Sequence, residues 1–190
     1  MLTYTIVVYA VSCVGLATNI HALDARQESA IAETFNIYAY GESISGLPVF
    51  YADGRAEIGD AVLSRAAVAQ PVYFTVSDTS RNAWIAYPNT TEINEAPFNS
   101  AVLSLSPTES ADGAVEFLQP SAEVIAANSV FDIYGNYVLV LRENVNFYAV
   151  PTEADGVYSL IWSDVASEHI PVTLRTIAPA TDAVLQNEPV

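Results

Sequence analysis

The amino-acid sequence predicts an all-β domain, and three observations support this prediction. Val, Ile, Tyr, Phe and Thr are frequent from residue 34 onward, and these residue types favour strands. Turn-forming residues recur at intervals of roughly eight to twelve positions, as they do in sandwiches and barrels. No long stretch carries apolar residues at helical spacing. The chain of 190 residues is long enough to bury a substantial core in one such domain.

The tripeptide Ala-Asp-Gly occurs three times, at residues 52–54, 111–113 and 154–156. Asp-Gly suits a tight turn, because Gly accepts a positive φ and Asp can bond its own backbone. Short apolar runs flank each copy, so we expect each copy at the tip of a β-hairpin, with longer loops at the second and third. Three of only eight glycines are placed in this way, which indicates repeated architecture.

One further strand is expected on each side of every hairpin, which gives three four-stranded units and twelve strands. These outer strands are expected at residues 34–40, 71–76, 83–87, 129–134, 137–141 and 171–177. The layout resembles a β-trefoil, in which six strands close a barrel and three hairpins cap it. A two-sheet β-sandwich is the alternative, and the likeness of "FNIYAY" to "FDIYGN" favours such a two-fold arrangement.

Alternation along the expected strands separates an inward from an outward face. The residues expected to face inward are Phe35, Ile37, Phe50, Ile58, Val72, Phe74, Val76, Ile85, Leu103, Leu105, Phe117, Phe131, Ile133, Val138, Val140, Phe147, Leu160, Val172 and Leu174. The tyrosines expected on the opposite register are Tyr38, Tyr40, Tyr51, Tyr73, Tyr87, Tyr148 and Tyr158.

The chain is expected to divide into four parts: 1–22, 23–33, 34–178 and 179–190. The first 22 residues hold no charged side chain and an apolar run that ends at small residues, which is typical of a secretory signal peptide. Cleavage after Ala17, Ala22 or Ala25 fits this pattern, and a membrane anchor is the alternative. An N-terminal extension, the single all-β domain and a flexible tail follow.

The net charge of −16, with six arginines and no lysine, argues against nucleic-acid and anionic-membrane partners. Removal of the signal peptide would remove Cys13, the only cysteine, so the exported chain would hold no disulfide. Asn89 begins an Asn-Thr-Thr sequon after Pro88 and is the expected site of N-glycosylation. The predicted location is extracellular or in the cell wall.

Known catalytic patterns are weakly represented, so we expect no enzyme, no catalytic residue and no cofactor. A serine triad would depend on His169, and "GESISG" has the wrong spacing for a nucleophile elbow. Zinc would need a cluster of His or Cys residues, and the sequence has none. Asp53, Glu57 and Asp60 could offer oxygens to calcium, but Arg55 would lie on the same side as Asp53 and Glu57 and neutralise them, so no metal is expected. A hydrolase that uses two of the 22 carboxylates is not excluded.

Exposed tyrosines beside aspartates favour carbohydrate binding, since rings pack on sugar C–H faces and carboxylates accept from hydroxyls. The candidate ligand-binding residues are Asp53, Asp112, Asp155, Tyr51, Tyr148 and Tyr158. The expected function is therefore a secreted binding protein for a polysaccharide or glycoprotein. The alternatives are an extracellular inhibitor or effector that acts through residues 59–70 and 87–101, and a structural component of the cell wall.

Four segments resemble a family of small secreted proteins from filamentous fungi. They are "FNIYAYGESISGLPVFYADG", "NFYAVPT", "GVYSLIW" and "PVTLRTIAP". The resemblance covers most of the predicted mature chain and implies an extracellular or cell-wall setting. It implies no catalytic residue and no established activity.

Overall fold

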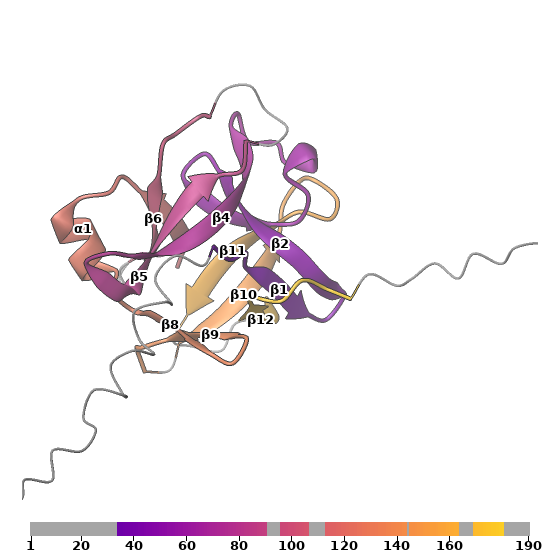
Figure 1. Ribbon diagram of the computed structural model, residues 1–190. Helices are drawn as coiled ribbons and strands as arrows, with labels where there is room; N and C mark the ends of the chain where they lie inside the picture. Colours follow the sequence, from indigo (N-terminus) through magenta and orange to yellow (C-terminus); the bar gives the residue numbers. More distant parts are fainter. Residues whose placement is uncertain (1–33, 91–95, 107–112, 144, 164–168, 181–190) are drawn as a thin grey trace, which may run out of the picture. The chain divides into compact units, whose positions relative to one another are not determined.

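A computed structural model describes residues 34–90, 96–106, 113–143, 145–163 and 169–180 (Figure 1). Its strands are β1 (Tyr38–Gly41), β2 (Ile44–Ala52), β3 (Arg55–Ile58), β4 (Ala69–Ser77), β5 (Ser80–Pro88), β6 (Ala101–Leu105), β7 (Val115–Leu118), β8 (Phe131–Tyr134), β9 (Tyr137–Val140), β10 (Asn146–Pro151), β11 (Tyr158–Ser163) and β12 (Ile170–Arg175). A 3₁₀ helix η2 (Ala61–Leu63) and a short helix α1 (Ala122–Ala127) complete the described elements. The predicted all-β class and the positions of all twelve strands are confirmed. The predicted signal peptide, the N-terminal extension and most of the tail lie outside the described residues.

The twelve strands form one antiparallel sheet. Ten of them close into a ring in the order β1-β2-β4-β5-β6-β7-β3-β11-β10-β12, since β12 pairs with β1. The ring is not an even barrel, because β2 also pairs with β3 across it. The hairpin of β8 and β9 joins the ring through one residue pair between β9 and β12. In Figure 1, β10 lies beside β11 and β12, while α1 lies against β5.

The first Ala-Asp-Gly copy forms the tight turn between β2 and β3. Asp53 and Gly54 both have positive φ, 47° and 87°, which is the conformation of a two-residue hairpin turn. The third copy lies in the longer connection between β10 and β11, where Gly156 has φ 78°. The second copy falls between the paired strands β6 and β7, but Asp112 lies outside the described residues. The expected hairpins are therefore confirmed, and the longer third loop is confirmed with them.

The glycines of the three copies bring their carbonyl groups against another hairpin. Phe117 of β7 donates its N–H to the Gly54 carbonyl at 2.8 Å, and Trp162 of β11 donates to the Gly113 carbonyl at 2.8 Å. The Gly156 carbonyl closes the cycle, because it lies only 2.5 Å from where a Cβ of Gly59 would stand. The first hairpin thus contacts the second, the second contacts the third, and the third contacts the first.

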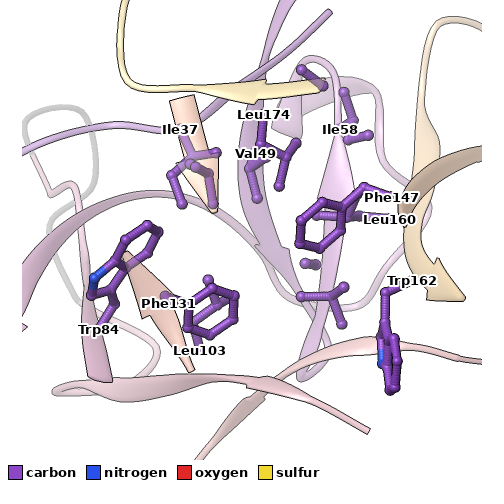
Figure 2. Packing of buried hydrophobic residues seen from close by; sticks show 14 of the residues in the cluster. Ile37, Val49, Ile58, Trp84, Leu103, Phe131, Phe147, Leu160, Trp162 and Leu174 are labelled. Atoms are coloured by element: carbon purple, nitrogen blue, oxygen red, sulfur yellow. The ribbon is translucent and has the colours of Figure 1, made fainter. Parts of the chain in front are cut away.

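Apolar side chains from strands distant in sequence meet in one main core (Figure 2). Trp84 of β5 stacks on Phe131 of β8, with ring centroids 5.0 Å apart. A smaller cluster of Phe50, Ala52, Ala154 and Val157 lies on the other face of β2. Alternation located much of the main core, although Phe50 faces the smaller cluster and Ile85 lies outside the main core. Most of the residues expected to face inward are buried.

Ile133 is the exception, because it is 36 % exposed although it was expected to face inward. It shares a strand face with Phe131, which is fully buried. The difference follows from the position of the β8–β9 hairpin. β12 pairs with this hairpin only at its turn end, where Tyr137 lies opposite Arg175, and Ile133 is not among the side chains that pack on the main core.

Candidate functional site

Asp53, one of the residues expected to bind ligand, uses its carboxylate to hold the following segment of chain. Its two oxygens accept hydrogen bonds from the backbone N–H groups of Ala67 and Val68, both at 2.8 Å. The side chain therefore ties the segment after η2 to the β2–β3 turn. Asp155 is exposed, in contrast, at the connection between β10 and β11. Asp112 falls outside the described residues, so the three aspartates are not seen as equivalent sites.

The three tyrosines named with these aspartates pack against other side chains and are not exposed on the surface. Tyr148 is only 6 % exposed, so its expected exposure is wrong, although it does alternate with Phe147 and Ala149 of the main core. Tyr51 is half-buried and lies against Phe98 and Phe117, with ring centroids 4.5 Å and 5.5 Å away. Tyr158 packs on the main core from the start of β11. Both faces of β2 and of β10 are covered, which is why alternation did not leave an outward side for these rings.

A hollow of about 310 Å³ does lie between the first and third Ala-Asp-Gly connections. Its lining is charged and its charges are largely matched within the protein. Arg65 pairs with Glu153 at 2.9 Å, and Ser64 donates its hydroxyl to Glu57 at 2.8 Å. The first contact joins the segment after η2 to the β10–β11 connection, and the second joins the same segment to β3. Asp53 and Ala154 line the same hollow, so the structure brings parts of the first and third copies together.

The outer face of the β4–β5 hairpin offers a different kind of hollow, of about 260 Å³. Tyr73 and Tyr87 stack directly across the two strands, with ring centroids 5.5 Å apart and planes 16° apart. Tyr87 lines the hollow together with Asp78 and a group of hydroxyl side chains. Those hydroxyls belong to Thr75, Ser77, Thr79 and Ser100.

The turn after β4 fixes the polar end of this second hollow. The Ser77 hydroxyl lies 3.1 Å from the Thr79 hydroxyl and accepts from the Thr79 N–H at 3.3 Å. Asp78 stands between them and is exposed. Within the described residues, its carboxylate makes no hydrogen bond or ion pair, so it is open to a ligand. Ile125 of α1 and Pro120 supply an apolar wall beside Tyr87.

Sequence reasoning identified Tyr73 and Tyr87 as outward-facing but did not place them in a site. The available signal was their position on either side of "TVSDTS", which puts two rings at the same level of one hairpin. The Ala-Asp-Gly repeat drew attention to other turns, and in the first of them the aspartate has a structural role. The Asp-Thr turn between β4 and β5 has no repeat to mark it.

Other sequence predictions concern single residues. His169 is exposed, just before β12. The described ranges contain no group of three or more His, Cys, Asp or Glu side chains able to hold a metal ion. Asn89 is exposed and directly follows β5. The part of the chain that the structure describes has no helix with the length and apolar character needed to cross a membrane.

Comparison with protein-family models, with curated proteins and with solved structures found no match for this chain. The resemblance to small secreted fungal proteins therefore stays a prediction.

Proposed function

We propose that this chain is an exported, non-enzymatic protein that binds carbohydrate of a cell wall or another extracellular surface. The observation that supports this proposal is a hollow lined by both the carboxylate of Asp78 and the ring of Tyr87, which stacks on Tyr73. We place the ligand on the outer face of the β4–β5 hairpin rather than at the Ala-Asp-Gly turns.

The chemistry of this hollow matches what a sugar offers. A sugar ring has an apolar C–H face that packs on an aromatic ring, and hydroxyls that donate to carboxylates. Tyr87 supplies the ring, while Asp78, Thr75 and Ser100 supply polar partners on the same surface. At about 260 Å³ the hollow is somewhat smaller than the roughly 300–1,000 Å³ of pockets for drug-sized ligands. One sugar unit of a longer chain is therefore the expected occupant.

We also propose that the ring of strands is organised as a β-trefoil. The mutual contacts of the three hairpins through Gly54, Gly113 and Gly156 support a three-fold arrangement. The six strands outside the three hairpins support it too, because four pairings join them one to the next: β4–β5, β8–β9, β9–β12 and β12–β1. A bridge from Phe35 to Phe74 joins the start of the domain to β4. A hydrogen bond from Asn82 to the Phe131 carbonyl at 2.8 Å links β5 to β8.

The test of the binding proposal is a glycan array and a pull-down with insoluble polysaccharides, using the full chain after secretion. Tyr87→Ser and Asp78→Asn should each weaken binding, because they remove the ring and the charged acceptor. Tyr134→Ser is the matched control, since Tyr134 is 76 % exposed on the β8–β9 hairpin. No binding to any glycan by the unmodified protein, or equal losses in all three variants, would contradict the proposal.

A protein partner is the second candidate, and one surface favours it. Val62 of η2 is 85 % exposed and Leu63 is 54 % exposed, within the segment 59–70 that was expected to contact a partner as an inhibitor or effector. Val62→Ser with Leu63→Ser would abolish capture of such a partner while leaving glycan binding intact. Capture of a secreted protease that depends on these two residues would favour this function over the first.

A further inference from the structure

A third hollow, of about 270 Å³, lies between the middle of β2, η2 and the start of β4. Unlike the other two hollows, it is lined mostly by apolar groups, among them Pro48, Phe50, Ala61 and Pro71. Its polar lining is confined to three residues that reach solvent, Asn36, Asp60 and Asn89. Apolar surface therefore lies directly beside the predicted N-glycosylation site at Asn89.

The backbone of Asn89 is held firmly at the edge of this hollow. Its N–H donates to the Pro71 carbonyl at 2.8 Å, which continues the β4–β5 ladder by one step. Its carbonyl accepts from the side-chain amide of Gln70 at 2.7 Å, and Gln70 is 1 % exposed. A group attached to Asn89 would therefore leave the protein from a fixed point beside Pro71. The Asn89-Thr90-Thr91 sequon is the sequence signal for such a group.

We propose that Asn89 carries an N-linked glycan whose first N-acetylhexosamine lies in this apolar hollow. The inference rests on the export that the proposed function requires, but not on carbohydrate binding at the β4–β5 hairpin. The sugar would place its C–H face and acetyl methyl on Pro48 and Pro71. Its amide and hydroxyls would meet the polar atoms of Asn36 and Asp60, so both kinds of surface find partners.

The size of the hollow fits one sugar ring. Pockets for drug-sized ligands span roughly 300–1,000 Å³, so a hollow of about 270 Å³ suits a smaller group. The hollow is built by residues of the fold itself, since Phe50 is fully buried and Val49 and Val72 belong to the main core. It is therefore present before any glycan is attached.

The attachment step uses an oligosaccharide on a polyprenyl diphosphate, the donor class of the secretory pathway. The Asn89 Nδ2 forms a bond to the anomeric carbon, and the bond from that carbon to the diphosphate oxygen breaks. The polyprenyl diphosphate leaves with the bonding electron pair, and Nδ2 loses one proton. No oxidant or reductant takes part.

The experiment compares three forms of the full chain secreted from a yeast host behind a leader of that host. The first is fully glycosylated, the second is trimmed by an endoglycosidase to a single sugar, and the third is stripped by an amidase that leaves Asp at position 89. Binding of a neutral apolar fluorescent probe, N-phenyl-1-naphthylamine, reports whether the hollow is open. We expect low probe fluorescence for the first two forms and a severalfold rise for the stripped form.

A Thr91→Ala variant provides the matched control, because it prevents glycosylation and keeps Asn89 itself. It should show the same severalfold rise as the stripped form, with an unchanged near-ultraviolet circular dichroism spectrum. An unmodified Asn89 by mass spectrometry would overturn the proposal, and so would equal probe binding by the single-sugar and stripped forms. Because the yeast leader directs export, failure of the protein's own leader would contradict only the proposed location.

Discussion

Two hairpins of this protein have similar turns and different surroundings. The β2–β3 hairpin turns at Asp53-Gly54, and the β8–β9 hairpin turns at Gly135-Asn136, where Gly135 has φ 61°. The first is paired with other strands on both sides, and both of its faces are covered. The second leaves Ile133, Tyr134 and Leu139 exposed. The turn residues therefore specify a hairpin, while neighbouring strands decide how deeply it is buried.

The largest expected effect on the free energy of unfolding is at the β2–β3 hairpin. Phe50→Ala should lower the free energy of unfolding by about 3–5 kcal/mol, because it empties a fully buried site of the smaller cluster. Urea unfolding followed by tryptophan fluorescence measures the loss. A loss below about 1 kcal/mol would show that the cluster collapses around the smaller side chain, and that the hairpin is less tightly covered than described.

A smaller loss is expected from the turn aspartate of the same hairpin. Asp53→Ala should lower the free energy of unfolding by roughly 2 kcal/mol, because it removes two hydrogen bonds and places Ala at positive φ. Asp155→Ala is the control and should stay within about 0.5 kcal/mol, since that side chain is exposed. Thermal unfolding of both variants decides the matter, and equal losses would mean that the two turns are equivalent after all.

The turn glycines test whether turn chemistry is independent of burial. Gly54→Ala and Gly135→Ala should each lower the free energy of unfolding by about 1–2 kcal/mol, because both have positive φ and open space around the missing Cβ. Gly→Asn at the same positions should recover part of the loss, since Asn tolerates positive φ better. Clearly different losses at Gly54 and Gly135, measured by urea unfolding, would show that burial of a hairpin changes the requirement for glycine at its turn.

The smallest effect on the free energy of unfolding is expected at the β8–β9 hairpin. Ile133→Ser should lower the free energy of unfolding by about 1 kcal/mol, because the side chain is 36 % exposed and loses only part of the burial of a core residue. Phe131→Ser, two residues earlier on the same face, serves as the contrast because Phe131 is fully buried. Losses of similar size in urea unfolding would show that something covers Ile133 in solution.

Much of the fold follows from local patterns in the sequence. The strands and the three repeated hairpins could be predicted because alternation and Asp-Gly turns act over a few residues. The environment of the tyrosines could not, since it depends on which distant strands cover a face. On β2, Val49 faces the main core while its neighbour Phe50 faces the smaller cluster, so a strand with alternating apolar residues is covered on both sides. Tyr51 and Tyr148 were misplaced for that reason.

The candidate site at the β4–β5 hairpin was only partly predictable. Tyr73 and Tyr87 could be assigned to an outward face, but their stacking depends on the register between the two strands. The open carboxylate of Asp78 and the wall from α1 depend on folding of residues about 40 positions apart. A single sequence does not express such long-range proximity.

The cyclic contact of the three hairpins has a consequence for how the protein opens. Each hairpin tip is held by another one, so none of them can detach without disturbing its neighbours. Amide hydrogens of Phe117 and Trp162 should then exchange with solvent only when the whole domain unfolds, rather than through separate local openings. A chain with no cysteine in its described residues would in this way resist stepwise attack by proteases through shared backbone contacts.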